Sequence, residues 1–148
     1  MSVAVTIRPT APDDIDAIGA IYAQYVQTGV ATFELTAPDR DELLRRFDTI
    51  TSAGLPYLTA ELDGQVAGYA YCAPWKTRPA YRHTVEDSIY VAPDAVGNGV
   101  GGRLLDGVLG ACQEAGIRQV IAVIVDAEAD ASLALHRQRG FVDTGRLA

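Results

Sequence analysis

The sequence predicts an α/β (α+β) protein in which helices flank a mixed central β-sheet. Three observations support this prediction: apolar residues at helical spacing near the N-terminus, two extended segments joined by a tight turn, and a continuous apolar run near residue 120. The length of 148 residues is usual for one domain, so we expect a single domain over residues 1–148. The 49% hydrophobic content allows a substantial core and excludes a largely disordered chain.

The first half of the chain contains two predicted helices and a β-hairpin. Apolar residues recur at helical spacing over 15–26, which favours a first helix ending near residue 27. Asp39 and Glu42 have the spacing of a capping box at the start of a second helix. The dipeptide Asp63-Gly64 predicts the turn of the hairpin. The expected strands and helices of this half cover residues 3–8, 15–27, 39–50, 57–62 and 65–72.

The second half alternates predicted strands and helices. Gly116 is a natural helix end, although Gly107 and Gly110 inside the preceding helix each cost about 1 kcal/mol relative to alanine. The apolar run over 119–125 predicts a strand that is buried on both faces. Gly140 ends a short helix, and a last strand begins over 141–144. The expected elements of this half are a loop, a strand, a glycine-rich turn, a helix, a strand, a helix and a strand, over residues 73–81, 84–91, 93–102, 99–115, 119–125, 131–139 and 141–144.

Charge and composition exclude several classes of partner. The 12 lysines and arginines against 19 acidic residues give a net charge of −7, which disfavours nucleic acid as a main partner. No apolar stretch is long enough to cross a membrane, and residues 1–10 lack the apolar core of a signal peptide. Cys72 and Cys112 have no metal-ligand spacing, so we expect no metal. A reduced cytoplasmic protein fits these features best.

Four glycines follow the strand over 84–91 and precede a helix. In the stretch from Val96 to Gly102 they let the backbone approach an anion, and the helix adds free N–H groups, which together predict a diphosphate cradle. Alternatively, the stretch is a flexible connection without a ligand. The same glycines match G-x-G-x-x-G, and Asp126 occupies the place of a ribose-binding acid, so a nucleotide-dependent oxidoreductase is a second alternative. The residues between the strand and Gly97 weaken that pattern.

Several stretches recur in the order and spacing of a known family. They are ATFE, GYAY, YRHTVEDSIYV, the glycine turn, IAVI, and LH followed by GF, at residues 31–34, 68–71, 81–91, 97–101, 121–124, 135–136 and 140–141. Over about residues 7–145 the chain resembles the GNAT N-acetyltransferase superfamily, and within it the phosphinothricin and methionine sulfoximine acetyltransferase-like subgroup. The resemblance implies a GNAT-like sheet, acetyl-CoA as co-substrate, a small amino-acid-like amine as acceptor, and a homodimer.

The resemblance also implies two catalytic residues. Glu86 matches the carboxylate that would accept a proton from the acceptor amine. Alternatively, Glu86 is an ionised partner of Arg82 or Arg78. His136 stands where many members carry a tyrosine that protonates the leaving thiolate, a role that a histidine can fill near neutral pH. Alternatively, His136 is a packed or surface group.

The binding residues follow from the same resemblance. The strand end and the glycine turn would hold acetyl-CoA, through Ile89, Tyr90, Val91, Gly97, Asn98, Gly99, Gly101, Gly102 and Arg103. The acceptor would contact Phe33, Glu34, Trp75, Arg78 and Arg82. The two arginines suit a bidentate grip on a carboxylate. Alternatively, Phe33 is a core residue, Trp75 covers apolar surface, and the arginines are solvated.

Three departures from the family pattern bear on activity. Val96 replaces an arginine or glutamine, which costs roughly ten- to hundredfold in cofactor affinity if a charged hydrogen bond is lost. Ala129 replaces an asparagine. The chain stops at Ala148, where relatives continue into a further hairpin, so we expect the C-terminal hairpin to be missing and a strand edge to be exposed. These departures favour the alternative of a catalytically weak or inactive acyl-CoA-binding homologue.

Overall fold

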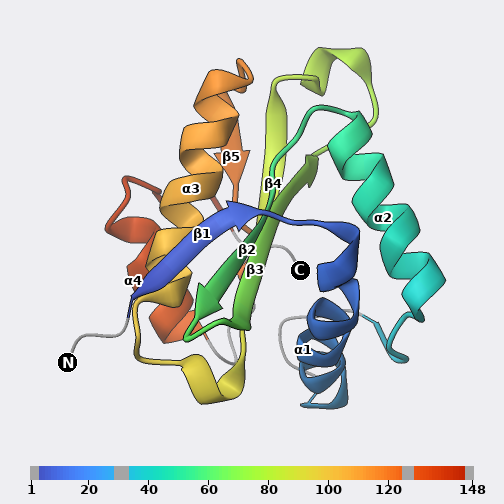
Figure 1. Cartoon of the computed structure of the whole chain (residues 1–148). Coiled ribbons are helices and arrows are strands. Elements are labelled where there is room, and N and C mark those ends of the chain that lie inside the picture. Colours follow the sequence, from blue (N-terminus) through green and yellow to red (C-terminus); the bar gives the residue numbers. More distant parts are fainter. Residues whose placement is uncertain (1–3, 29–33, 125–128, 146–148) are drawn as a thin grey trace.

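The computed structural model describes residues 4–28, 34–124 and 129–145 (Figure 1). Five strands form one mixed sheet in the order β1-β2-β3-β4-β5. The first four strands are antiparallel to their neighbours, and β5 runs parallel to β4. The strands are β1 (Val5–Pro9), β2 (Tyr57–Leu62), β3 (Gln65–Pro74), β4 (Thr84–Val91) and β5 (Gln119–Ile121), and the helices are α1 (Ile15–Thr28), α2 (Arg40–Ser52), α3 (Val100–Glu114) and α4 (Ala129–Arg137). This arrangement confirms the predicted mixed sheet flanked by helices.

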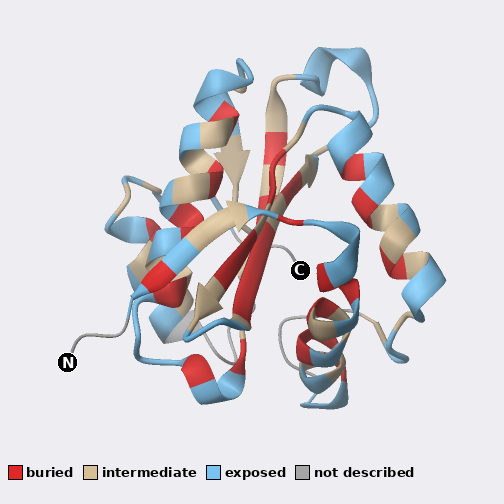
Figure 2. Ribbon diagram, viewed as in Figure 1, coloured by how far each residue is buried: buried red, intermediate tan, exposed pale blue. Residues whose placement is uncertain are grey.

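The helices cover opposite faces of the sheet (Figure 1). Alternate side chains of a strand point to opposite faces, and this alternation decides which helix each residue meets. Tyr90 of β4 packs edge-on against Tyr22 of α1, with ring centroids 5.3 Å apart. On the other face, Cys72 of β3 meets Cys112 of α3, with Sγ atoms 3.5 Å apart. Figure 2 shows the deepest burial along the central strands β3 and β4.

Local sequence signals account for the best-predicted elements. The bounds of β2 and β4 agree with the prediction. The turn between β2 and β3 places Asp63 and Gly64 at φ of 54° and 76°, the left-handed conformation that this dipeptide favours. Asp39 caps α2, because its carboxylate accepts the Glu42 N–H at 2.9 Å.

The predicted C-terminal elements need correction. β5 comprises only Gln119–Ile121, and it is exposed or half-buried, so the prediction of a strand buried on both faces is wrong. Within the described ranges β5 has a neighbour on one side only, which leaves its other side uncovered. Residues 141–145 form no strand, because the Phe141 N–H bonds to the His136 carbonyl at 3.2 Å and its ring packs on His136. β3 extends two residues further than predicted, to Pro74.

Gly107 and Gly110, in the middle of α3, have different surroundings. A Cβ at Gly107 would lie 2.9 Å from Leu58 Cδ1 and 3.3 Å from Ile7 Cγ2, so the missing side chain lets α3 approach β1 and β2 closely. A Cβ at Gly110 would meet nothing within 4 Å. Of these two, Gly107 has a packing reason to be glycine and Gly110 has none in the described ranges. None of the helices in the described ranges is long and apolar enough to cross a membrane.

Candidate active site

The site is built on the end of β4, where its edge faces away from β3. The Ala92 N–H donates to the Ala67 carbonyl at 2.8 Å, which fixes the alternation of backbone groups between the two sides of β4. The N–H and C=O groups of Ile89 and Val91 therefore face the β5 side. β5 pairs with β4 no further than Glu86. In the described part of the chain, the strand pair thus ends before Ile89.

Tyr25 of α1 binds the last backbone groups on this edge. Its hydroxyl donates to the Val91 carbonyl at 2.8 Å and accepts from the Val91 N–H at 3.3 Å. Its ring packs edge-on against Tyr90, with centroids 5.1 Å apart. Two of the residues predicted to bind the cofactor lie here. The backbone groups of Val91 are bound by the Tyr25 hydroxyl. The backbone groups of Tyr90 face β3, because successive residues of a strand point their backbone groups to opposite sides.

The glycine-rich turn leaves the start of α3 open. Gly97 and Gly99 have φ of 91° and 77°, and Gly99 is the N-cap residue without any capping side chain. A Cβ at either position would meet nothing within 4 Å. The first N–H groups of a helix have no partner within the helix, so this end suits an anion such as the diphosphate of acetyl-CoA. Asn98 braces the turn by donating its side-chain amide to the Ala95 carbonyl at 3.0 Å.

The other two predicted glycines contact α4. A Cβ at Gly102 would lie 2.8 Å from a terminal nitrogen of Arg139, and one at Gly101 would lie 3.5 Å from Leu135. The absence of side chains at these glycines therefore lets the α4 region pack closely on α3, and it also leaves the backbone accessible to a ligand. Arg103, on the first turn of α3, is exposed, and so is Val96, at 68%.

Glu86 is half-buried on the face of the sheet that α1 and α2 cover. Burial raises the pKa of its carboxyl above the usual range, the charge of Asp87 raises it further, and Lys76 opposes both effects. No ion pair in the described ranges joins Glu86 to Arg78 or Arg82, so the structure does not support that alternative. A general base works best when its pKa lies near the operating pH, and this shift is in that direction.

His136 of α4 forms a buried pair with Asp87 of β4. Its Nε2 lies 2.8 Å from Asp87 Oδ2, and the Ser132 carbonyl accepts from Nδ1 at 2.8 Å. The two side chains are only 7% and 1% exposed. Burial alone would lower the pKa of His136, but the hydrogen bond and charge of Asp87 outweigh it, so the net pKa is raised. Both ring nitrogens are therefore engaged by the protein, as in the alternative of a packed histidine.

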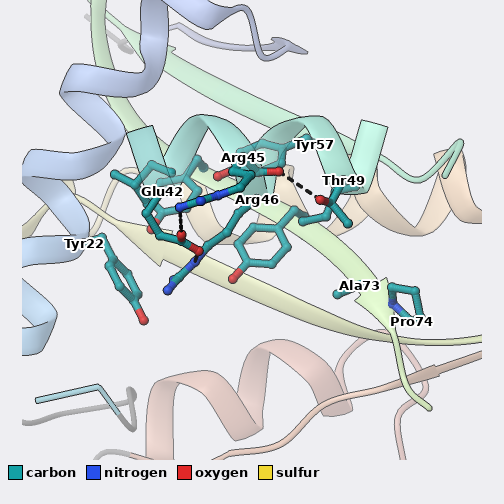
Figure 3. A pocket seen from close by; sticks show the side chains of 12 residues that line it. Tyr22, Glu42, Arg45, Arg46, Thr49, Tyr57, Ala73 and Pro74 are labelled. Carbon is teal, nitrogen blue, oxygen red and sulfur yellow. Dashed lines mark hydrogen bonds and ion pairs between the residues drawn. The ribbon is translucent and has the colours of Figure 1, made fainter. Parts of the chain in front are cut away.

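A cavity of about 380 Å³ lies between α2 and the sheet (Figure 3). Its walls include Ala73, which is paired with Glu86 across the β3–β4 ladder. Four phenol rings line the cavity, those of Tyr22, Tyr57, Tyr69 and Tyr71, and α2 contributes both charged and apolar residues, Arg45 and Arg46 among them. The position beside Glu86 makes this cavity a candidate acceptor pocket.

Glu34 reaches this cavity through two of its lining residues. The Tyr22 hydroxyl donates to Glu34 Oε1 at 2.7 Å, and Arg46 donates to the same carboxylate at 2.7 and 3.2 Å. The bonds from Arg46 hold the pKa of Glu34 below its usual value. Phe33, the other predicted residue of this segment, lies outside the described residues.

The loop after β3 holds the other predicted acceptor residues away from the cavity lining. Trp75 is half-buried, and Lys76 lies over its ring at 4.8 Å from the centroid. Arg78 and Arg82 are exposed, and Arg82 donates to the Pro79 carbonyl at 3.0 Å. The arginines that line the cavity are instead Arg45 and Arg46 of α2, which the sequence analysis missed.

One signal in the sequence points to Arg46. It follows Leu43 by three positions and precedes Ile50 by four, so it lies on the apolar stripe of α2. A charged residue on such a stripe needs a partner at the helix–sheet boundary. Tyr69 and Tyr71 are two positions apart on β3, so the sequence also predicts that their side chains lie on the same face of the sheet.

Comparisons with known proteins show what this chain is similar to. The model of the Acetyltransferase (GNAT) family matches residues 21–141. Phosphinothricin N-acetyltransferase of Alcaligenes faecalis is 49% identical over 144 residues, 97% of this chain and 73% of that protein. The L-methionine sulfoximine/L-methionine sulfone acetyltransferase of Pseudomonas aeruginosa is 34% identical over 96% of this chain and 83% of its own length.

A solved structure extends the likeness to three dimensions. The crystal structure of a GNAT superfamily phosphinothricin acetyltransferase from Sinorhizobium meliloti, in complex with AcCoA, superimposes with a TM-score of 0.92. It shares 45% sequence identity and covers 98% of this chain and 77% of that one.

Proposed function

This chain belongs to the GNAT family of acetyltransferases, and on that premise we propose that it transfers acetyl from acetyl-CoA to the amine of a small amino-acid-like acceptor. The acceptor is of the phosphinothricin or methionine sulfoximine type, as the names of two relatives indicate. One observation carries the proposal: Glu86, whose carboxyl pKa is raised by burial, is paired with Ala73 of the cavity wall and lies on the strand whose end, at Ile89, has no β5 pairing in the described ranges. The family membership replaces the oxidoreductase alternative, whose Asp126 lies outside the described residues.

Two parts of the chain would hold acetyl-CoA. The backbone of Ile89 faces the uncovered edge of β4, and Val91 would join it where the Tyr25 hydroxyl gives way. The glycine turn from Gly97 to Gly102 would hold the diphosphate, with Asn98 bracing it and Arg103 nearby as an exposed positive charge. Tyr90 would support this edge through its ring, which packs against Tyr25. When bound, acetyl-CoA supplies the acetyl group as a thioester, which the acceptor amine takes directly.

The chemistry asks two proton movements of this chain. Glu86 would accept a proton from the acceptor amine, directly or through water, because only a neutral amine is a nucleophile. The departing sulfur must gain a proton, and His136 is the proposed source. Its Nε2–H is held by Asp87, so a donor role requires that this hydrogen bond be released.

The acceptor would lie on the α1–α2 face of the sheet, with its amine at Glu86. Glu34 would contribute through its bonds to the cavity wall. The loop between β3 and β4 would contribute Trp75, Arg78 and Arg82 to acceptor binding. The guanidinium groups of its two arginines are exposed, so they could bind a carboxylate of the acceptor. Phe33 stays a predicted contact.

The test is release of free CoA thiol from acetyl-CoA with phosphinothricin, methionine sulfoximine and methionine sulfone as acceptors. Turnover that is lost in Glu86→Gln and kept in the exposed control Glu114→Gln would support the proposal. Calorimetric binding of acetyl-CoA without turnover would favour the alternative of an inactive acyl-CoA-binding homologue. Absence of both binding and turnover would overturn the enzyme assignment.

Three broader proposals accompany this function. We propose one domain over residues 1–148, a cytoplasmic location, and a homodimer. The buried Cys72 and Cys112, free thiols 3.5 Å apart, support a reducing compartment. Within the described ranges β5 pairs with β4 alone, and its free edge supports the proposal that a second chain covers it. Light scattering tests the dimer, which would have twice the chain mass of 15.7 kDa.

A further inference from the structure

We propose that Tyr57 and Tyr69 form a subsite that binds a terminal S=O or P=O oxygen on the side chain of the acceptor. The inference rests on the proposed function, because the cavity becomes a side-chain pocket only when the acceptor amine lies at Glu86. It adds two specificity-determining residues that lie in the interior of the sheet, away from the glycine turn.

The two rings are fixed in place by their neighbours. Tyr57 of β2 and Tyr69 of β3 lie nearly parallel, with centroids 6.2 Å apart, and Tyr71 stacks on Tyr57 at 5.0 Å. Phe47 of α2 packs edge-on against Tyr57 at 5.2 Å. Tyr57 is 6% exposed and Tyr69 is 2% exposed. A ligand in the cavity would therefore meet two preorganised side chains.

Among the residues that the structure describes, their hydroxyl groups have no protein partner, although buried phenols normally have one. The Tyr22 hydroxyl binds Glu34 and the Tyr25 hydroxyl binds Val91. Within the described ranges, no hydrogen bond joins the hydroxyl of Tyr57 or Tyr69 to another protein atom. Both residues line the cavity, so their hydrogen-bonding capacity is available there.

The protonation state of these phenols makes them donors. Burial raises the pKa of both Tyr57 and Tyr69, so each keeps its proton at neutral pH. A neutral phenol donates one hydrogen bond, and the oxygens of a sulfone, sulfoximine or phosphinate are strong acceptors.

Charge in the cavity is balanced by the protein itself. Arg46 donates to Glu34. Arg46 and Arg45 both pair with Glu42 (Figure 3). Two positive and two negative side chains therefore leave no net charge to attract an ion. Recognition by hydrogen bonds from phenols is thus favoured over recognition by charge.

The cavity begins beside the strand position that pairs with Glu86. Ala73 lines the cavity and is directly paired with Glu86, and both side chains share the α1–α2 face. An acceptor whose amine lies at Glu86 would therefore extend its side chain past Ala73 into the cavity. A side chain with an oxygen near its end is the class that would use the two hydroxyl groups there.

The experiment compares methionine sulfone with methionine, which lacks the two oxygens. In the parent protein we expect kcat/KM to favour the sulfone. Tyr57→Phe and Tyr69→Phe should each lower that preference about five- to tenfold, the usual effect of one hydrogen bond. Tyr81→Phe, at a 43% exposed tyrosine, is the matched control and should leave the preference unchanged. Melting temperatures establish that the variants are folded.

Calorimetric titration with methionine sulfone measures the subsite independently of turnover. Weaker binding in Tyr57→Phe or Tyr69→Phe supports the inference even if the parent transfers no acetyl group. Unchanged preference and unchanged binding in both variants would overturn it while leaving the proposed function intact. With phosphinothricin, a similar loss assigns the P=O oxygen to the same hydroxyls, and a loss confined to the sulfone restricts the subsite to S=O.

Discussion

Replacing His136 with asparagine removes one partner of the buried pair with Asp87. The asparagine side chain still offers an N–H to the Ser132 carbonyl, so the variant isolates the bond to Asp87. The Asp87 side chain is 1% exposed, and its Oδ1 already has no partner within the described ranges. His136→Asn therefore leaves a carboxylate buried without compensation.

The expected loss is large for a single substitution. Removing one partner of a buried ion pair costs about 3–5 kcal/mol, against a total stability of about 5–15 kcal/mol for a domain. For a chain of this size the melting temperature should fall by about 10 °C. Urea unfolding, followed by the fluorescence of Trp75, measures the free energy directly.

The pH dependence has a definite sign. Because the folded-state pKa of His136 is raised, the pair stabilises the fold fully below the ordinary histidine pKa of about 6.5. The contribution is lost as pH rises through the raised pKa, so the difference between parent and His136→Asn should shrink there. The double variant with Asp87→Asn should be less destabilised than the sum of both single variants, by about 1–3 kcal/mol. Additive single variants, with no change across this pH range, would refute an ionised pair.

Three further outcomes are expected. Glu86→Gln should lower kcat/KM about 10²–10⁴-fold and remove the rise of kcat/KM with pH, because the rise in the parent follows ionisation of a carboxyl with a raised pKa. Gly99→Ala should weaken calorimetric acetyl-CoA binding roughly tenfold, since φ of 77° is strained for alanine by about 1–2 kcal/mol. In α3, Gly110→Ala should raise the unfolding free energy by about 0.5–1 kcal/mol, whereas Gly107→Ala should lower it through the clash with Leu58. Equal effects of the two alanines on urea unfolding would contradict the packing argument.

Sequence reasoning located those features that depend on neighbouring residues. The alternation over β2 and β4, the Asp63-Gly64 turn and the Asp39 cap are local, and each was predicted. The chain after α4 was not, because Phe141 packs against His136 and no local pattern reports that contact.

The residues of the candidate site also fall into those that a local motif predicts and those that only the fold brings together. Glu86 and the glycine turn lie on short motifs with a chemical meaning of their own. The pair of Asp87 and His136 joins residues 49 positions apart, and it forms because Asp87 faces away from Glu86 toward α4. Arg46 of α2 and Glu34, in the segment between α1 and α2, meet through a turn of the chain that only the fold defines. Side chains become partners there through tertiary packing, which a single sequence does not encode locally.

The hydroxyl of Tyr25 has a consequence for how the protein behaves in concentrated solution. An uncovered strand edge offers unpaired N–H and C=O groups to any extended segment that arrives, which is the usual first step of aggregation. By binding both backbone groups of Val91, Tyr25 shortens the stretch of β4 that is available for such pairing. A phenylalanine at this position would keep the ring but remove the hydroxyl from both backbone groups of Val91, so we expect that variant to associate more readily at high concentration.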